Sequence, residues 1–242
     1  MSAPALSEAP VPHGPLKRLK DRLKDGAHAV LRPLVRGLAA VGLKPDHLTW
    51  LGFVVSLGSG FAFFDGHFKL GASLLLAAGV CDILDGELAR HLDQVSRFGA
   101  FLDSTLDRLA EAAALAGIAA FGLRNLLALV FAPDEVLKQL ALGLPPIAWA
   151  VLAFLAVLAL VGSFMVSYTR ARAEGLGVDC KVGWFERPER MVLLILAGYI
   201  KVFPVLSVSL AVLAVLSFAT ALQRVVHVHK QTRGAGLDRS RP

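Results

Sequence analysis

Charged residues and cysteines are scarce in this sequence of 242 residues. Only 18% of the residues are Asp, Glu, Lys or Arg, against about a quarter in a typical soluble domain. Hydrophobic residues make up 55% of the chain, and they form blocks of membrane-spanning length. The two cysteines, Cys81 and Cys180, show no CxxC or other metal-ligand spacing, which excludes a disulfide scaffold. The composition predicts a polytopic membrane protein with a single domain.

The hydropathy pattern predicts an all-α integral membrane protein with six transmembrane helices, at 48–64, 70–90, 100–122, 147–169, 188–203 and 205–226. The last two meet at Pro204, which favours a tight turn. Residues 1–14 have no apolar run, and this absence predicts a disordered segment at the amino terminus. Residues 15–44 predict a basic amphipathic helix on the membrane surface, because leucines recur at helical spacing among Lys and Arg. The six spans fill 45–226, and residues 227–242 form a basic tail.

Positive charge is distributed unevenly over these segments. The amino-terminal segment, the second-to-third and fourth-to-fifth connections and the tail hold 20 of the 25 Lys and Arg residues. An even number of crossings puts all four on one side, which the positive-inside rule makes the cytosolic side of the cell membrane. Both termini are therefore expected in the cytosol. The net charge of +6 favours contact with anionic lipid over nucleic acid, since the basic tail has no interleaved aromatic residues.

Four aspartates interrupt the apolar character of the second and third predicted spans. Asp82 and Asp85 are three residues apart, and Asp103 and Asp107 are four apart, so each pair lies on one helical face. An ionised carboxylate at the centre of a span costs about 2.5–3.5 kcal/mol, so such residues need a partner. If the two helices form a hairpin, four carboxylates converge, and oxygen ligands of this kind select magnesium or manganese. Four acids are enough for two divalent ions. Structural ion pairs with nearby arginines are the alternative.

The pattern Asp82-x2-Asp85-Gly86-x2-Ala89-Arg90-x8-Gly99-x3-Asp103-x3-Asp107 resembles the signature of the CDP-alcohol phosphotransferase family at every position. The resemblance implies transfer of a phosphatidyl or similar group from a CDP-linked donor to an alcohol, with release of CMP. It implies that the four aspartates hold two divalent metals and that Asp107 is also the general base. The residues implied in the site for the CDP-lipid nucleotide are Pro45, Asp46, Thr49, Gly86, Ala89, Arg90, Ser96 and Gly99.

The stretches 98–108, 167–177 and 186–190 resemble the branch of this family that makes phosphatidylinositol phosphate or archaetidylinositol phosphate. The resemblance implies CDP-diacylglycerol as donor and a phosphorylated polyol, inositol 1-phosphate, as acceptor, and it also implies a homodimer. Arginine forks suit a phosphate, and by position those expected to hold it are Arg170, Arg187, Arg190 and Arg224. The alternative is that these arginines only obey the positive-inside rule. Glycerol 3-phosphate is the competing acceptor.

A protein of another class, an ion-coupled transporter, also places carboxylates within the membrane. However, the acids here lie at one end of two adjacent spans, and no broken-helix repeat is apparent. The sequence therefore favours an enzyme whose active site faces the cytosol.

Overall fold

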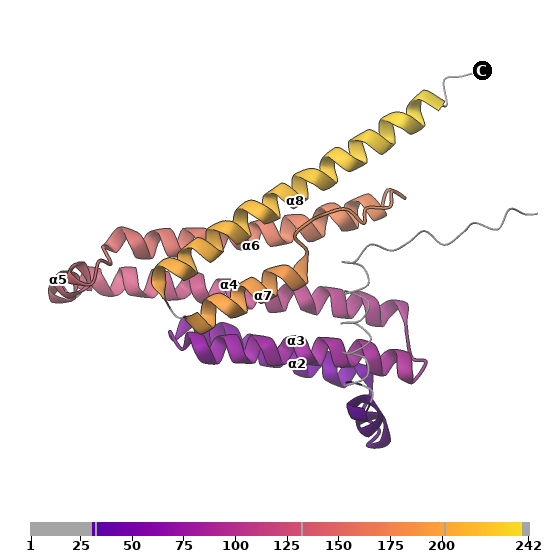
Figure 1. The fold of residues 1–242 in the computed structure, drawn as a ribbon, viewed down its shortest axis with the longest axis horizontal. Helices are drawn as coiled ribbons and strands as arrows, with labels where there is room; N and C mark the ends of the chain where they lie inside the picture. Colours follow the sequence, from indigo (N-terminus) through magenta and orange to yellow (C-terminus); the bar gives the residue numbers. More distant parts are fainter. Residues whose placement is uncertain (1–30, 32, 132, 201, 239–242) are drawn as a thin grey trace, which may run out of the picture.

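The computed structural model describes residues 31, 33–131, 133–200 and 202–238. Within these ranges all the regular secondary structure is helical, which confirms the all-α prediction (Figure 1). Residues 33–40 are helical, and they are followed by α2 (Pro45–Phe64), α3 (Phe68–His91), α4 (Arg97–Phe131), α5 (Pro133–Ala141), α6 (Pro146–Glu174), α7 (Arg187–Ile200) and α8 (Phe203–Asp238).

Four of the described helices, α2, α4, α6 and α8, are long and apolar enough to cross a membrane. Helix α3 is long enough but carries Asp82, Asp85 and Glu87 in its second half. Helix α7 has 14 residues, which is about 21 Å at 1.5 Å per residue and shorter than a hydrocarbon core of about 30 Å. The helices therefore agree with a membrane protein in which four spans stand out by length and composition.

Three helices continue beyond the ends that hydropathy predicts. Helix α4 runs to Phe131, α6 to Glu174 and α8 to Asp238, because hydropathy ends where polar residues begin, whereas the helix continues until a breaker or a cap. A break before the last helix is present as predicted, but Pro204 lies in the first turn of α8. Proline is tolerated there because the first backbone N–H groups of a helix have no intrahelical acceptor.

The predicted juxtamembrane helix is only partly within the described residues, since residues 1–30 and 32 lie outside them, as does the predicted disordered segment at 1–14. In the helical stretch 33–40, Val35 is buried against Leu48 of α2 and Leu84 and Leu88 of α3. The chain then turns at Gly42, whose φ of 78° suits a residue without a side chain. The end of this segment therefore packs on protein.

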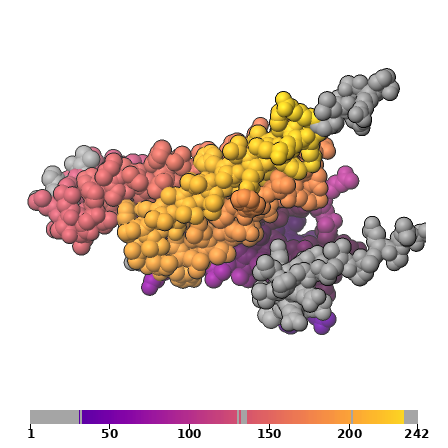
Figure 2. Space-filling view, turned by 45° about the horizontal axis from the view of Figure 1, so that its top comes forward, coloured from indigo at the N-terminus to yellow at the C-terminus, as the bar shows by residue number. Residues whose placement is uncertain are grey.

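Helix α4 lies at the centre of the bundle and packs against both α2 and α6. Helix α3 packs on α2, α8 packs on α6, and α7 bridges α3 and α8. In the space-filling view, α5, α6 and α8 (coral to yellow) fill most of the visible face, with the amino-terminal helices beneath them (Figure 2). The start of α4 and the ends of α3 and α6 lie toward one end of the bundle, on the right in Figure 1, and α8 runs toward the same side with its last turns projecting beyond the other helices.

The contact between α2 and α4 depends on two glycines. A Cβ atom built on Gly117 of α4 would lie 2.1 Å from the carbonyl oxygen of Gly60 on α2, and one built on Gly60 would lie 2.5 Å from the carbonyl oxygen of Ala113. Only residues without side chains allow the two backbones to approach this closely. These glycines thereby set the separation of the helices that carry much of the site described next.

Candidate active site

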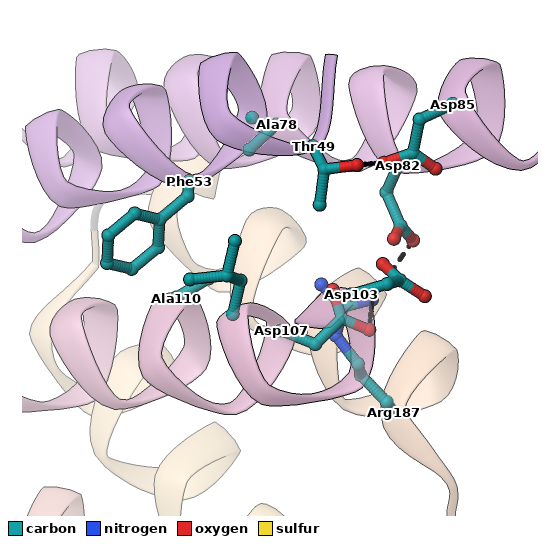
Figure 3. Close-up of a pocket in the computed structure, with 11 residues that line it drawn as sticks. Thr49, Phe53, Ala78, Asp82, Asp85, Asp103, Asp107, Ala110 and Arg187 are labelled. Carbon is teal, nitrogen blue, oxygen red and sulfur yellow. Dashed lines mark hydrogen bonds and ion pairs between the residues drawn. The ribbon is translucent and has the colours of Figure 1, made fainter. Parts of the chain in front are cut away.

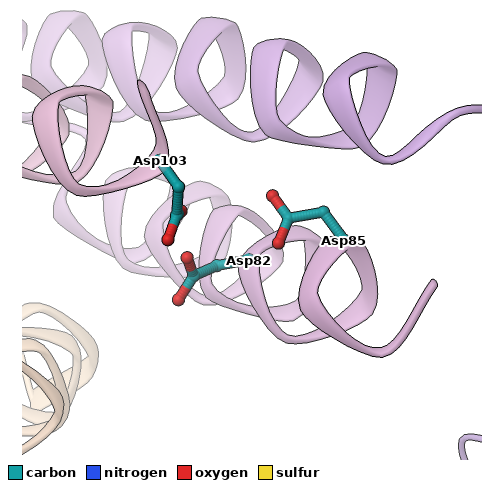
Figure 4. A group of neighbouring side chains, drawn as sticks. All are labelled: Asp82, Asp85 and Asp103. Carbon is teal, nitrogen blue, oxygen red and sulfur yellow. The ribbon is translucent and has the colours of Figure 1, made fainter. Parts of the chain in front are cut away.

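Three carboxylates from two helices converge at the common end of the bundle. Asp82 and Asp85 lie one turn apart on α3, and the short connection at 92–96 returns the chain so that Asp103 of α4 faces them (Figure 4). One oxygen from each of the three lies within 4.8 Å of the others. All-oxygen ligands at such spacing fit a hard divalent cation. This donor set fits the metal that the sequence predicts.

Helix α2 supports this cluster through Thr49. The Thr49 hydroxyl donates a hydrogen bond to Asp85 Oδ2 at 2.6 Å, and the Asp85 side chain is buried. The carboxylates face a small pocket between α2, α3 and α4 (Figure 3). The pocket is lined by Thr49, Gly52, Phe53, Ala78, Asp82, Asp85, Asp103, Leu106, Asp107, Ala110 and Arg187. The apolar side chains of Phe53, Ala78 and Ala110 lie toward one side of the pocket and the carboxylates toward the other (Figure 3).

The fourth aspartate, Asp107, lies one turn after Asp103 and pairs with an arginine. Arg187 Nη1 lies 2.6 Å from Asp107 Oδ2 and 3.0 Å from Asp82 Oδ2. The structure thus brings Asp82, Asp85 and Asp103 together, with Asp107 beside them in an ion pair. The sequence predicts an acceptor-phosphate role for Arg187 but not its contact with the carboxylates, because the two segments are 80 residues or more apart.

A second, larger cavity of about 310 Å³ adjoins the carboxylate pocket. Its walls come from α4, α6, α7, α8 and the residue before α7, and are formed by Asp103, Ser104, Asp107, Arg108, Glu111, Val166, Ser167, Arg170, Glu186, Arg187, Pro188, Arg190 and Arg224. Asp103, Asp107 and Arg187 line both spaces. A group bound by the arginines would therefore lie next to the carboxylate cluster.

Two of the four predicted arginines use their donors within the protein. Arg190, 2% exposed, donates from Nε and Nη2 to the two oxygens of Glu111 at 2.6 and 2.8 Å. Arg224, also 2% exposed, donates to the carbonyl oxygens of Val166 and Val182 and to Glu186. Glu111 is not among the residues that the sequence predicts for the site; its position one turn after Asp107 is the signal that points to it.

The other two arginines are more accessible. The side chain of Arg170 is 41% exposed and pairs with Glu174 at 2.9 Å, and that of Arg187 is 25% exposed. Within the described part of the chain, the buried Nε of Arg187 has no hydrogen-bond partner. A buried donor without a partner is costly, so Arg187 has a donor available for a ligand.

The residues assigned to the nucleotide site lie at the same end of the bundle but mostly outside the carboxylate pocket. Arg90 pairs with Glu87 at 2.6 Å, and both line a cavity of about 250 Å³ beside the helical stretch 33–40. Among the described residues, a Cβ on Gly86 would meet only the Arg90 side chain, at 3.6 Å, so Gly86 leaves room on that side. Ala89, in the next turn of α3, is half-buried.

The remaining predicted nucleotide residues have structural contacts of their own. The Ser96 hydroxyl accepts the Gly99 N–H at 2.9 Å, as an N-cap of α4 does. The carbonyl oxygen of Pro45 lies 3.2 Å from the Thr49 hydroxyl oxygen, as a second and longer contact beside the hydrogen bond to Asp85. Asp46 is exposed in the first turn of α2, where a negative charge favours the helix dipole. Of the residues in the α2 turn, Thr49 is the one that reaches the carboxylates.

Comparison with known proteins identifies the family. Residues 43–225 match the family described as CDP-alcohol phosphatidyltransferase. The chain is 35% identical over 208 residues to archaetidylinositol phosphate synthase of Methanothermobacter thermautotrophicus, covering 84% of this chain and 93% of that protein. It is 33% identical over 206 residues to phosphatidylinositol phosphate synthase of Mycobacterium tuberculosis, covering 81% and 84% respectively.

Solved structures of the mycobacterial synthase have the same fold. The form with CDP-DAG bound aligns with a TM-score of 0.65 at 30% identity over 83% of this chain and 94% of that chain. The complex with manganese and citrate aligns with a TM-score of 0.66 at 31% identity over 82% and 88%. The chain described here is a membrane phosphotransferase that belongs to the CDP-alcohol phosphatidyltransferase family. This membership excludes the transporter alternative.

Proposed function

We propose that this protein transfers the phosphatidyl group of CDP-diacylglycerol to inositol 1-phosphate and releases CMP. The observation that carries the proposal is the pair of adjoining cavities, one lined by carboxylates and one by arginines, with Asp103, Asp107 and Arg187 in their common wall. A donor diphosphate held at the carboxylates and an acceptor phosphate held by the arginines would meet at this wall. The names of the two relatives support inositol phosphate as the acceptor.

Asp82, Asp85 and Asp103 would hold the first of two divalent ions, magnesium or manganese. A second ion at Asp107 and Asp82 would compete with the Arg187 guanidinium, which contacts both carboxylates. When bound, the metal would neutralise negative charge on the diphosphate and stabilise the charge that develops on the leaving phosphate. Thr49 keeps Asp85 turned toward the cluster by its hydrogen bond.

Asp107 would take the proton from the attacking hydroxyl, since it lines both cavities. The hydroxyl oxygen forms a bond to the phosphorus that carries the diacylglycerol, and the bond from that phosphorus to the CMP oxygen breaks. Oriented binding of both substrates is the main contribution of the protein to such a reaction.

The arginine cavity suits a polyol that carries a phosphate. Arg170 and Arg187 have the more exposed side chains of the four arginines, and they would bind the phosphate. Ser104, Ser167 and Glu186 also line this cavity, and their oxygens can hydrogen-bond the remaining hydroxyl groups of the ring.

The CDP-lipid nucleotide would lie along the end of α3. Arg90, paired with Glu87 beside a cavity of about 250 Å³, has the charge for the diphosphate, and Gly86 and Ala89 keep this side of the helix small. Ser96, Gly99 and the Pro45–Thr49 turn would border the base and ribose. This assignment follows the family signature together with the space beside Gly86.

For the membrane we propose a six-span topology, with α3 and α7 as the two spans beyond the four long apolar helices. A divalent ion bound to Asp82 and Asp85 would neutralise the negative charge that these carboxylates of α3 place within the membrane. The Lys and Arg distribution supports cytosolic termini in the cell membrane, with the active site on the cytosolic side and the amino-terminal basic helix on its surface. We also propose a homodimer, on the family resemblance alone.

The function is tested by CMP release from purified protein with CDP-diacylglycerol and magnesium. The acceptor panel is inositol 1-phosphate, free inositol, glycerol 3-phosphate and serine. We expect release only with inositol 1-phosphate, and its loss when EDTA removes the metal. Release with glycerol 3-phosphate alone would overturn the acceptor but leave the reaction class. A dialkyl donor is run in parallel, and failure of every donor and acceptor pair would overturn the proposed reaction.

A further inference from the structure

Two ion pairs, one helical turn apart, connect α4 with α7. Asp107 of α4 pairs with Arg187 of α7 at 2.6 Å, and Glu111 of α4 pairs with Arg190 of α7 at 2.6 Å. The acids are four residues apart and the arginines three apart, so each pair lies on one face of its helix. The first pair borders the two cavities, and the second lies next to it, further from the metal-binding cluster along α4.

The two ion pairs differ in burial. Glu111 and Arg190 are 4% and 2% exposed, and both oxygens of Glu111 accept from the Arg190 fork. The remaining Nη1 of Arg190 donates weakly, at 3.5 Å, to the carbonyl oxygen of Phe185 in the loop before α7. A buried bidentate pair with this geometry permits little movement of either helix. In contrast, Arg187 is partly exposed, and its Nε has no partner among the residues that the structure describes.

Close backbone packing does not explain how α7 is held beside α4. The neighbours against which α7 packs closely are α3 and α8. Packing on α3 and α8 places α7 as a whole, and its direct link to α4 is made by long side chains, of which Glu111–Arg190 is the buried bidentate pair. A shift of α7 by a fraction of a turn would carry Arg187 away from Asp107 and Asp82.

We propose that Glu111 is a positioning residue, which acts through Arg190 to hold Arg187 in the wall between the carboxylate pocket and the arginine cavity. This inference rests on the proposed function for its consequence in catalysis. Arg190 then belongs to the support of the site and not to the phosphate contacts, because Glu111 and Phe185 take its donors. Loosening the pair would lower the fraction of molecules in which Arg187 is placed for the acceptor.

Manganese affinity tests the proposal without any turnover. A guanidinium on Asp107 and Asp82 repels a cation bound at the same oxygens, so Arg187→Gln is expected to tighten manganese binding on the order of tenfold. Glu111→Gln should change the affinity in the same direction, by releasing Arg187. In the Arg187→Gln background, Glu111→Gln should have no further effect, because residues that act through one another are not additive. Calorimetry with purified protein in detergent measures the manganese affinity of the parent, the two single variants and the double variant, which together form a double-mutant cycle.

The direction of change separates positioning from loss of structure. Leu152→Ala, a fully buried position in the α6 core away from the site, is the control for general destabilisation and should weaken manganese binding or leave it unchanged. If Glu111→Gln weakens binding, leaves it unchanged, or acts equally with and without Arg187, the proposal is wrong. Should Glu111→Gln not fold, Glu111→Leu with Arg190→Met removes both buried charges together, a replacement that buried ion pairs often tolerate, and enters the same cycle.

Kinetics then separate this inference from the proposed function. With inositol 1-phosphate as acceptor, Glu111→Gln should raise its KM on the order of tenfold, whereas the KM for CDP-diacylglycerol should change much less. An unchanged KM for inositol 1-phosphate in a folded variant would overturn the positioning role. If the parent protein releases no CMP with inositol 1-phosphate, the proposed function fails. The manganese affinities of the parent, the single variants and the double variant would still decide how Glu111 acts.

Discussion

The glycine contact between α2 and α4 supports a quantitative prediction. Replacing Gly117 by alanine adds a methyl group whose carbon would lie 2.1 Å from the carbonyl oxygen of Gly60 and 2.8 Å from its carbonyl carbon. Ordinary contacts begin near 3.4 Å, so the two helices must separate by about 1 Å or tilt. Helix backbones in contact have no flexible side chain that can move away instead.

The expected loss follows from a comparison with a second glycine. A Cβ on Gly79 of α3 meets nothing within 4 Å, so Gly79→Ala only gains helix propensity and should stabilise the protein by about 0.5–1 kcal/mol. Gly117→Ala gains the same propensity but adds the clash, which costs about 1–3 kcal/mol. The difference between the two variants should therefore be about 1–3 kcal/mol, because the propensity gain is common to both.

Thermal unfolding in detergent, followed by circular dichroism, measures this difference. For a chain of this size about 2–4 °C corresponds to each kcal/mol, so Gly117→Ala should unfold several degrees below Gly79→Ala. It should also bind manganese more weakly, since α2 carries Thr49 and α4 carries Asp103. Equal melting temperatures in the two variants would refute the reasoning, because the backbone contact would then impose no constraint.

Three further substitutions address the site. Asp107→Asn should reduce CMP release by at least about a hundredfold, the lower range for loss of a general base, with the melting temperature retained as a check on folding. Thr49→Val removes the hydrogen bond to Asp85 and should lower the free energy of unfolding by about 1–2 kcal/mol; Thr49→Ser keeps the hydroxyl and should melt like the parent. Arg170→Gln should raise the KM for inositol 1-phosphate about tenfold, whereas Arg172→Gln, exposed and outside the arginine cavity, should not; an equal rise in both variants would mean that the KM depends on overall positive charge and not on a contact made by Arg170.

The convergence of the carboxylates follows from the sequence because each step is local. Spacings of three and four residues put Asp82 with Asp85, and Asp103 with Asp107, on one helical face, and the short connection at 92–96 returns the chain. The helix ends were predicted less accurately, since hydropathy detects apolar character and not the residue at which a helix stops. This is why α4 and α8 are longer than their predicted spans.

The partners of the arginines, in contrast, do not follow from the sequence. The gathering of the arginines at one end was expected from the positive-inside rule and the resemblance, but their spacing does not indicate which of them has a partner. Arg190 meets Glu111 79 residues away, and Arg224 meets Val166 58 residues away. Such contacts depend on how α4, α6, α7 and α8 pack.

By itself, the sequence determined that this chain is helical, apolar and equipped with carboxylates on two facing helices, because periodicity and composition act over one or two helical turns. Only the tertiary structure decided the donors and acceptors that stay available. It buried Arg190 on Glu111, joined Arg187 to Asp107, and left the Arg187 Nε without a partner in the described chain. The physical reason is that hydrogen-bonding capacity is used up by whichever group lies nearest in space, and distance in space is set by helix packing.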